Sequence, residues 1–445
     1  MSKEELLGFG EVAVKKAISE GVNQVEVFLY EGKLLSISLE KGEVKKAGSI
    51  VEKGIGIRVA IGKKVGFSYS TGFEDIDDVV RRAIQNAKAS PPDQDFKSFP
   101  DPTEYRRVDG LYDKRIADLE VEDVSELISE MVESAKVDNR IYSIGGAFFS
   151  TAGTLAVLNS LGIERADDLT QTYIYAFISA KDGDDMSSGY EFNHGRHLSE
   201  IDPGWVGREA ANLAIKSLGS TRIETGFYDV VIDPMAMSPF IGFLVSSAAN
   251  AENIQYGRSF LTGKIGHKIA REEISIYDDG TIPGAYASVS FDGEGVTTMR
   301  TAVIQKGLLK SYIHNSYTAG KAGVRSTGNA SRSYDSLPSI DSHNVVLEAP
   351  SLETKKEELL DVKRGILFKD TGDRPNLANG EFSGLMSSAF LIENGEVTRG
   401  LKETGFGINL LDFLVRIDLL GDDRRQVGSI ISPSCRVKGM RIAGK

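Results

Sequence analysis

The stretch from residue 227 to residue 263 constrains the fold of this 445-residue chain more than any other. Its first part places the apolar residues Tyr228, Val230 and Ile232 at alternate positions, and Pro234 ends the run. Alternation with a period of two is typical of a β-strand that buries one face, and a proline cannot continue a central strand. The stretch is therefore predicted to begin with a strand.

A buried helix is predicted directly after this strand. Ser238 can cap a helix, and Pro239 fits the first helical turn, where its missing N–H costs nothing. Residues spaced by three and four positions then form one face of the helix: Phe240, Phe243, Leu244, Ser247, Ala248 and Ala251. The second half of the helix is almost entirely serine and alanine. Because small side chains let another backbone approach, the helix is predicted to pack tightly against a neighbour.

The strand, the corner and the buried helix resemble the corresponding segment of the TldD/PmbA (TldD/TldE) family. Active members of that family are zinc peptidases with the motif His-Glu-x-x-x-His on this helix. In this chain the corresponding window runs from Val245 to Asn250 and contains neither histidine nor glutamate. Hydrolytic zinc needs about three protein ligands and one open position. The resemblance therefore implies an inactivated homologue, closest to the zinc-less PmbA or TldE type.

A second departure from the catalytic members agrees with the first. In those members a cysteine, followed by glycine and a polar run that ends in glutamine, gives the third zinc ligand. Here the corresponding segment is residues 420–426, with Leu420 at the cysteine position. The resemblance covers essentially the whole chain, because six further short strings follow in the family's order. They begin at Phe291, Lys306, Thr327, Gly380, Ile392 and Gly407.

The periodic segments predict an α+β fold with a mixed N-terminal region in two segments and a β-rich, barrel- or sandwich-like C-terminal domain. We expect a first α+β segment at 1–90, a linker or loop at 91–115, a second α+β segment at 116–220 and the β-rich domain at 221–445. Helices are predicted at 3–20, 74–88, 121–136, 207–218, 355–363 and 410–419. Tight hairpins are predicted at Lys306-Gly307 and Asn394-Gly395, and the second dipeptide suits a type I′ turn.

Composition excludes several classes of protein. The net charge is −12 with no cluster of lysine or arginine, which argues against binding to nucleic acid phosphates. The single cysteine, Cys435, excludes an internal disulfide framework and a cysteine-rich zinc site. No apolar run reaches the roughly 18 residues of a membrane-spanning helix, and the polar start has no signal-peptide core. We therefore expect a cytoplasmic protein without membrane contact.

His194 and His197 are weak candidates for a metal site. Two histidines three positions apart can bind one metal when they lie on a helix. The alternative is a solvated loop, which Gly195 and the polar residues before it favour. This motif supports an alternative function, a stand-alone metallohydrolase built around His194 and His197.

Asp292 and Glu294, which flank Gly293, form a carboxylate pair that could serve as acid and base. The alternative is a hydrogen-bonded loop. Since the family motif that contains them lies in the C-terminal domain, the resemblance allows a role in lining a substrate groove. The candidates for that groove are Asn250, Asp292, Glu294 and Asn409.

The leading hypothesis from the resemblance is a non-catalytic subunit of a TldD/TldE-type peptidase. Such a chain would hold no cofactor of its own and would pair with a TldD-like homologue that carries the zinc. The two would enclose a channel for unfolded or leader peptides, bound in extended form, which suggests strand addition at a sheet edge. Without that partner the chain could form a homodimer. A gyrase-linked or nucleic-acid factor is a third hypothesis, which the negative charge disfavours.

Overall fold

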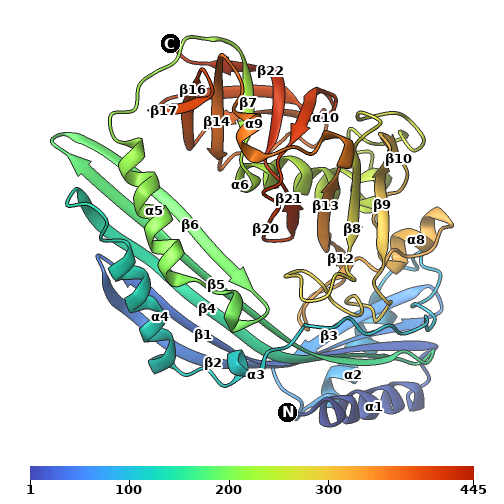
Figure 1. Cartoon of the computed structure of the whole chain (residues 1–445). Coiled ribbons are helices and arrows are strands. Elements are labelled where there is room, and N and C mark those ends of the chain that lie inside the picture. Colours follow the sequence, from blue (N-terminus) through green and yellow to red (C-terminus); the bar gives the residue numbers. More distant parts are fainter.

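The computed structural model describes residues 1–445 and has the predicted α+β architecture in two parts (Figure 1). The N-terminal part is a long, twisted sheet with helices along one side. The C-terminal part is β-rich and lies against the other side of that sheet (Figure 1). None of the helices combines the length and the apolar character that crossing a bilayer requires.

The N-terminal region is a single antiparallel sheet with the strand order β3-β2-β1-β4-β5-β6. Its strands are β1 (Gln24–Glu40), β2 (Glu43–Ile61), β3 (Lys64–Ser70), β4 (Ile141–Asn159), β5 (Glu164–Asp182) and β6 (Asp185–Gly195). The two segments predicted separately are joined because β1 pairs with β4, from Glu26 opposite Asn159 to Leu39 opposite Gly146. The segments are therefore two parts of one sheet.

Two hydrophobic cores lie on the same face of this sheet. The helices that cover it are α1 (Lys3–Ser19), α2 (Ile76–Ala89), α3 (Lys114–Ala117), α4 (Val121–Ser134) and α5 (Pro203–Ser217). Val25, Val27 and Leu29 of β1 belong to the core under α1 and α2, whereas Leu35 and Ile37 belong to the core under α4 and α5. All five residues are odd-numbered, so they point to one face of the strand. The even-numbered residues of β1 face the C-terminal part.

The C-terminal part consists of two sheets with a helix between them. The first sheet contains β10 (Leu308–Leu309), β9 (Arg300–Gln305), β8 (Ser275–Asp279), β13 (Asn344–Glu348), β21 (Ile430–Ser432) and β20 (Arg425–Val427), in that order. The second contains β15 (Glu381–Leu385), β18 (Gly405–Asn409), β22 (Cys435–Ala443), β7 (Gly226–Ile232), β14 (Arg364–Asp370), β16 (Ser388–Glu393) and β17 (Glu396–Leu401), with β19 (Ile417–Leu420) also paired to β22. Neither sheet closes into a barrel, so the arrangement is layered and sandwich-like, with the helix between the two sheets.

The remaining C-terminal elements are short. They are the hairpin of β11 (Ala330–Ser331) and β12 (Ser339–Ile340), and the helices α6 (Pro234–Met237), α7 (Ala251–Gln255), α8 (Ser316–Ala322), α9 (Lys356–Leu359) and α10 (Leu410–Arg416). The helix predicted at 410–419 ends at Arg416, because Ile417 and Leu420 are buried in β19 and pair with β22. Both predicted hairpin turns are confirmed by positive φ angles, 53° at Asn394 and 88° at Gly395 in one, and 49° at Lys306 and 74° at Gly307 in the other.

The helix after β7 differs from its prediction in start and in geometry. It begins at Pro234, capped by the Asp233 carboxylate, which accepts the Met235 N–H, and not at Ser238. It continues through two π-helical segments, η2 (Ser238–Gly242) and η3 (Leu244–Ala248). The buried residues of this run are 240–242, 244, 245 and 248–250, and the residues between them are partly exposed. The predicted inward face is therefore correct for Phe240, Leu244 and Ala248, and Phe243 also packs against the core, whereas Ser247 lies on the open side.

A close backbone approach joins the two parts of the molecule at Gly56 in β2. A Cβ atom at this position would lie 2.1 Å from the carbonyl oxygen of Tyr334. We predict that Gly56→Ala lowers the free energy of unfolding by about 1–3 kcal/mol, the usual cost of overpacking. Gly407→Ala in β18 is the matched control, since a Cβ there meets nothing within 4 Å. Equal melting temperatures for the two variants would contradict the prediction.

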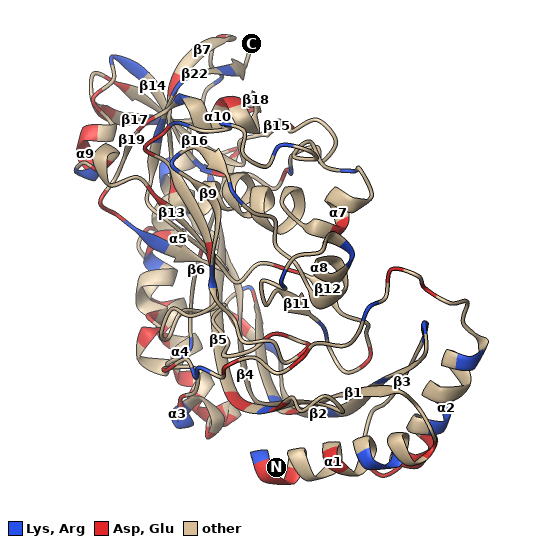
Figure 2. Cartoon of the chain, turned by 90° about the vertical axis from the view of Figure 1, so that its right-hand side faces the viewer, with Lys and Arg blue, Asp and Glu red and all other residues tan.

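Charge is distributed without a basic face on the outer helices. Along α1 and α2, basic and acidic residues are interspersed (Figure 2). Several are paired across the helix surface, for example Lys15 with Glu11 at 2.8 Å and Arg82 with Asp78 at 3.0 Å. Acidic and basic side chains on these two helices therefore lie close enough to neutralise one another.

Candidate functional site

The π-helical run after β7 forms the floor of an open groove. Its wide turn is shown by the Ala249 N–H, which donates to the Leu244 carbonyl five residues back at 2.9 Å. One side of the run is buried among aromatic rings, and Phe240 lies 4.7 Å from Phe382 and 4.6 Å from Phe413 between ring centroids. The other side is partly exposed. Short π-helical segments are frequent at functional sites, which directs attention to this open side.

We call the cavity on this side the helix groove. It has a volume of about 480 Å³. The helix contributes Ser238, Pro239, Gly242, Phe243, Ser246 and Ser247, and the walls are Asp341, Ser342, residues 371–374, Ser429 and Ile430. The small residues noted in the sequence therefore leave room for a ligand along this face, in addition to allowing tight packing behind it.

The spacing of residues along the groove face can be compared with a motif whose two histidines are five positions apart. Bonds between residues five apart stack such residues over one another, and Gly242 and Ser247 form such a pair on the groove side. In the window predicted from the resemblance, Val245 to Asn250, the two end positions do not line the groove, although Ser246 and Ser247 between them do. Val245 is fully buried in the core, and Asn250 is 8% exposed. The sequence alone could not show which residues of the helix occupy the ligand positions of the motif, because no histidine or glutamate is present on the helix to identify them.

The residues of the helix groove do not fit a zinc ion. Gly242, Phe243 and Ser247 supply neither nitrogen nor carboxylate ligands, and none of the five histidines of the chain is followed by glutamate. The acidic groups of the groove are Asp341 and Asp373, and Asp373 already accepts the Leu385 N–H at 2.7 Å. No group of three or more histidine, cysteine or acidic side chains is arranged to hold a metal ion. This donor set does not match the three ligands of hydrolytic zinc.

Asn250 and Asn409, two of the four predicted groove residues, cap helices. The Asn250 amide oxygen accepts the Glu252 N–H at the start of α7, and its nitrogen donates to the Ile340 carbonyl at 3.1 Å. Asn409 caps α10 and donates to the Asn379 carbonyl at 3.0 Å. Neither side chain lines the helix groove. Both therefore have structural roles in this fold.

Asp292 holds a loop in shape. Its carboxylate accepts backbone N–H groups of Glu294 at 2.9 Å, Val296 at 3.0 Å and Ala330 at 2.9 Å. The residue is 3% exposed, and burial together with the neighbouring Glu294 raises the pKa of Asp292 well above its usual range. The three backbone donors bind both of its oxygens and fix the orientation of the carboxyl group within the loop. The hydrogen-bonded loop is the alternative that this geometry supports.

Glu294 belongs to a buried network that joins the two parts of the chain. It accepts a hydrogen bond at 2.8 Å from Arg58 of β2, which also donates to both oxygens of Glu26 in β1. Arg332 donates to Glu26 at 2.6 Å from the C-terminal side. The four side chains are between 0% and 9% exposed. The two carboxylates and two guanidinium groups balance in charge. Because their hydrogen bonds join β1 and β2 to the C-terminal part, we call these four side chains the interdomain anchor.

His194 and His197 point to different surroundings and share no ligand set. The His194 Nε2 accepts the Gly428 N–H at 2.9 Å, and its ring lies 4.2 Å from the Tyr286 ring centroid. The His197 Nε2 lies 3.1 Å from the Gly110 carbonyl oxygen. One histidine ends β6 and contacts the C-terminal part, while the other contacts the linker. The two histidines therefore bind separate partners and do not converge on one metal position.

The buried position of His194 predicts a pH effect on stability. Burial, and secondarily Arg425, lower the pKa of His194 to about 4. Protonation then favours the unfolded chain, so stability is unaffected above about pH 6.5 and falls as the pH drops from 6.5 toward 4. We expect the melting temperature of His194→Gln to fall less than that of the unaltered chain between about pH 7 and pH 4.5, because the variant lacks the group that gains a proton on unfolding. The solvent-exposed His267→Gln should leave the decrease unchanged, and an equal effect of both variants would contradict the prediction.

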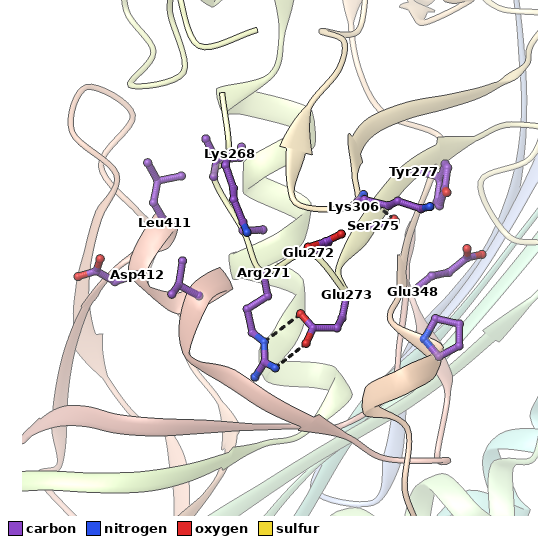
Figure 3. Close-up of a pocket in the computed structure, with 14 residues that line it drawn as sticks. Lys268, Arg271, Glu272, Glu273, Ser275, Tyr277, Lys306, Glu348, Leu411 and Asp412 are labelled. Atoms are coloured by element: carbon purple, nitrogen blue, oxygen red, sulfur yellow. Dashed lines mark hydrogen bonds and ion pairs between the residues drawn. The ribbon is translucent and has the colours of Figure 1, made fainter. Parts of the chain in front are cut away.

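A larger cleft lies elsewhere on the C-terminal part. Its volume is about 1090 Å³, and its charged walls include Lys268, Lys306 and Glu348 (Figure 3). Arg271 and Glu273 form a two-bond ion pair at 2.7 and 3.2 Å within it (Figure 3). These paired charges satisfy one another, and none of the predicted groove residues lines the cleft.

Comparisons with known proteins identify the family. The chain matches PmbA/TldA metallopeptidase domain 1 over residues 25–87, the central domain over 114–218 and the C-terminal domain over 225–444. It is 30% identical to an uncharacterised protein of Methanocaldococcus jannaschii over 99% of both chains, and 25% identical to metalloprotease PmbA of Escherichia coli O157:H7 over 91% of this chain and 90% of that protein. TldE of Thermococcus kodakarensis has the same fold, with a TM-score of 0.89 at 23% identity over 98% of this chain and all of that one. The chain therefore belongs to the PmbA/TldD family of metallopeptidases.

Proposed function

We propose that this chain is a zinc-less, PmbA/TldE-like subunit of a TldD/TldE-type metallopeptidase complex that acts on unfolded or leader peptides. It holds an extended peptide in the helix groove and leaves hydrolysis to a TldD-like homologue that carries zinc. The observation that carries the proposal is the groove face of the π-helical run. Gly242, Phe243 and Ser247 stand there at the spacing of the family's zinc motif, and none of them is a metal ligand.

The chemistry of the groove suits an extended peptide backbone. Hydroxyl groups of Ser238, Ser246 and Ser247 line its floor, and those of Ser342 and Ser429 line its walls. A hydroxyl both donates and accepts, so it can bond to the unpaired N–H and C=O groups of a peptide in either direction. Arg374 and Asp341 add one charge of each sign. These groups bind and orient a chain without selecting one sequence.

Reconstitution tests this division of labour. The chain alone, a TldD-like homologue alone and an equimolar mixture of the two are incubated with fluorescein-labelled casein, an unstructured substrate. We expect hydrolysis by the mixture to exceed the sum of the separate rates by about tenfold or more, because substrate binding and chemistry then lie in one complex. Hydrolysis by this chain alone that a chelator abolishes would contradict the proposal and favour the stand-alone metallohydrolase.

A further inference from the structure

A smaller cavity lies where the linker meets both parts of the chain, and we call it the linker cavity. Its volume is about 250 Å³. Arg58 of β2 and Val65 of β3 line it from the N-terminal sheet, and the linker contributes residues between 93 and 99. The C-terminal part contributes α7, α8 and residues 337–338. None of these residues lines the helix groove, so a ligand here would be independent of the proposed peptide site.

Aromatic rings form much of the wall of the linker cavity. Phe96 and Phe99 are buried and meet edge to face, with their ring centroids 5.4 Å apart. Tyr256 and Tyr317 line the cavity from the C-terminal part. An apolar cavity of about 150 Å³ is large enough to bind benzene. The linker cavity therefore has the size and the lining for one aromatic ring with a short substituent.

The guanidinium group of Arg58 supplies a buried donor to this cavity. Its Nε and Nη2 atoms donate to Glu26 and Glu294, whereas Nη1 forms no hydrogen bond within the chain. The Arg58 side chain is 9% exposed, and its Cζ atom lies 4.9 Å from the centroid of the Phe99 ring. Nη1 keeps some accessible surface, so it presents its N–H groups to the cavity that Arg58 lines. A charged donor in such a site forms a strong hydrogen bond with an oxygen acceptor.

Glu294 places a hydrogen-bond acceptor beside this donor. One of its oxygens accepts Nη2 of Arg58 at 2.8 Å, and the other accepts the Ser316 N–H at 2.8 Å. Each carboxylate oxygen has two lone pairs, so Glu294, which also lines the cavity, can accept a further N–H. A donor and an acceptor side by side match the C=O and N–H groups of an amide. A carboxylate ligand lacks the donor, and an ammonium ligand lacks the acceptor.

The charges around the linker cavity favour an uncharged ligand. Arg58 belongs to the interdomain anchor, whose positive and negative charges already balance. Lys321, the other cation of the lining, pairs with Asp95 at 2.6 Å. Asp93 and Glu252 add two carboxylates to the lining. A ligand carboxylate would therefore be buried here without a free cation to compensate it, which is unfavourable.

We propose that the linker cavity binds a small, uncharged aromatic amide. Its ring lies against Phe96 and Phe99, its carbonyl oxygen accepts from Arg58, and its N–H donates to Glu294. Such a ligand contacts the N-terminal sheet, the linker and the C-terminal part at once. It therefore binds the assembled arrangement of the two parts and stabilises it by mass action.

Fluorine NMR of the full chain with ring-fluorinated phenylacetamide as the probe tests the proposal. We expect saturable line broadening with a dissociation constant of about 1 mM or below, a range open to a ligand of about ten heavy atoms. Ring-fluorinated phenylacetate, which differs only in its carboxylate, should bind at least about tenfold more weakly. Val65→Phe adds a ring inside the cavity and should weaken binding of the amide at least about tenfold, by occupying its volume. Val397→Phe in β17, which is 41% exposed and outside the cavity lining, is the matched control and should leave binding unchanged.

Three results would overturn the proposal. The first is no saturable broadening of the amide probe by the unaltered chain. The second is equal or tighter binding of phenylacetate, and the third is unchanged binding of the amide by a folded Val65→Phe variant. Melting temperatures show whether Val65→Phe is folded. If it is not, Leu337→Ala replaces it, because this lining residue is 57% exposed and its truncation leaves the core intact. We expect Leu337→Ala to weaken binding about threefold through lost apolar contact, and unchanged affinity would again contradict the proposed site.

Discussion

Replacement of Arg58 by methionine is expected to lower the free energy of unfolding by about 3–5 kcal/mol, the range for breaking a buried ion pair. The change leaves the carboxylates of Glu26 and Glu294, which are 0% and 2% exposed, without the guanidinium that bonds to both. Methionine fills a similar volume, so the loss comes from uncompensated charge and not from a cavity. Urea denaturation followed by circular dichroism measures it.

Two further variants separate charge from shape in this network. Arg81→Met on α2 removes an arginine that is 67% exposed, and its effect should be within about 0.5 kcal/mol. Glu294→Gln combined with Arg58→Met removes the carboxylate that no other arginine bonds to, whereas Glu26 keeps Arg332, so the double variant should recover part of the stability. A loss below about 1 kcal/mol for Arg58→Met alone would mean that the network does not anchor the two parts.

Filling the helix groove should abolish peptide binding. Ser246 lies on the groove floor and is half-buried, so Ser246→Trp places an indole in the cavity without entering the core. We expect the affinity for fluorescein-labelled casein to fall by about a hundredfold, since one large side chain displaces several hydrogen-bonded positions of the bound chain. Fluorescence anisotropy with the labelled protein as probe measures the change.

The matched control for this variant is Ser129→Trp on the exposed side of α4. It adds the same side chain far from the groove and should leave the affinity unchanged. Equal binding by the unaltered chain and the Ser246→Trp variant would show that the peptide binds outside the helix groove.

Local features of the fold could be predicted because local interactions determine them. The Asn394-Gly395 turn followed from two residues that tolerate positive φ. The helices α1, α2 and α4 followed from apolar periodicity. The union of the two N-terminal segments could not be predicted in this way, because the pairing of Glu26 with Asn159 spans most of the region and leaves no local signal.

The site was predicted less well, for two physical reasons. The π-helical turn shifts which residues share a face, and a 3.6-residue period hides this shift. The spacing of Asp292 and Glu294 predicts a carboxylate pair, yet Asp292 accepts backbone N–H groups, and Glu294 accepts Arg58 and the Ser316 N–H. The missed residues had a signal: Glu26 and Arg58 each interrupt an apolar run in a strand, as buried charges with a distant partner do.

The zinc content of the purified chain, measured by elemental mass spectrometry without added metal, tests the central claim most directly. The donor set of the helix groove predicts less than about 0.1 zinc per chain, because fewer than three suitable ligands converge there. About one zinc per chain, the stoichiometry of a mononuclear hydrolytic site, would contradict the claim that this member of the family depends on a zinc-bearing partner.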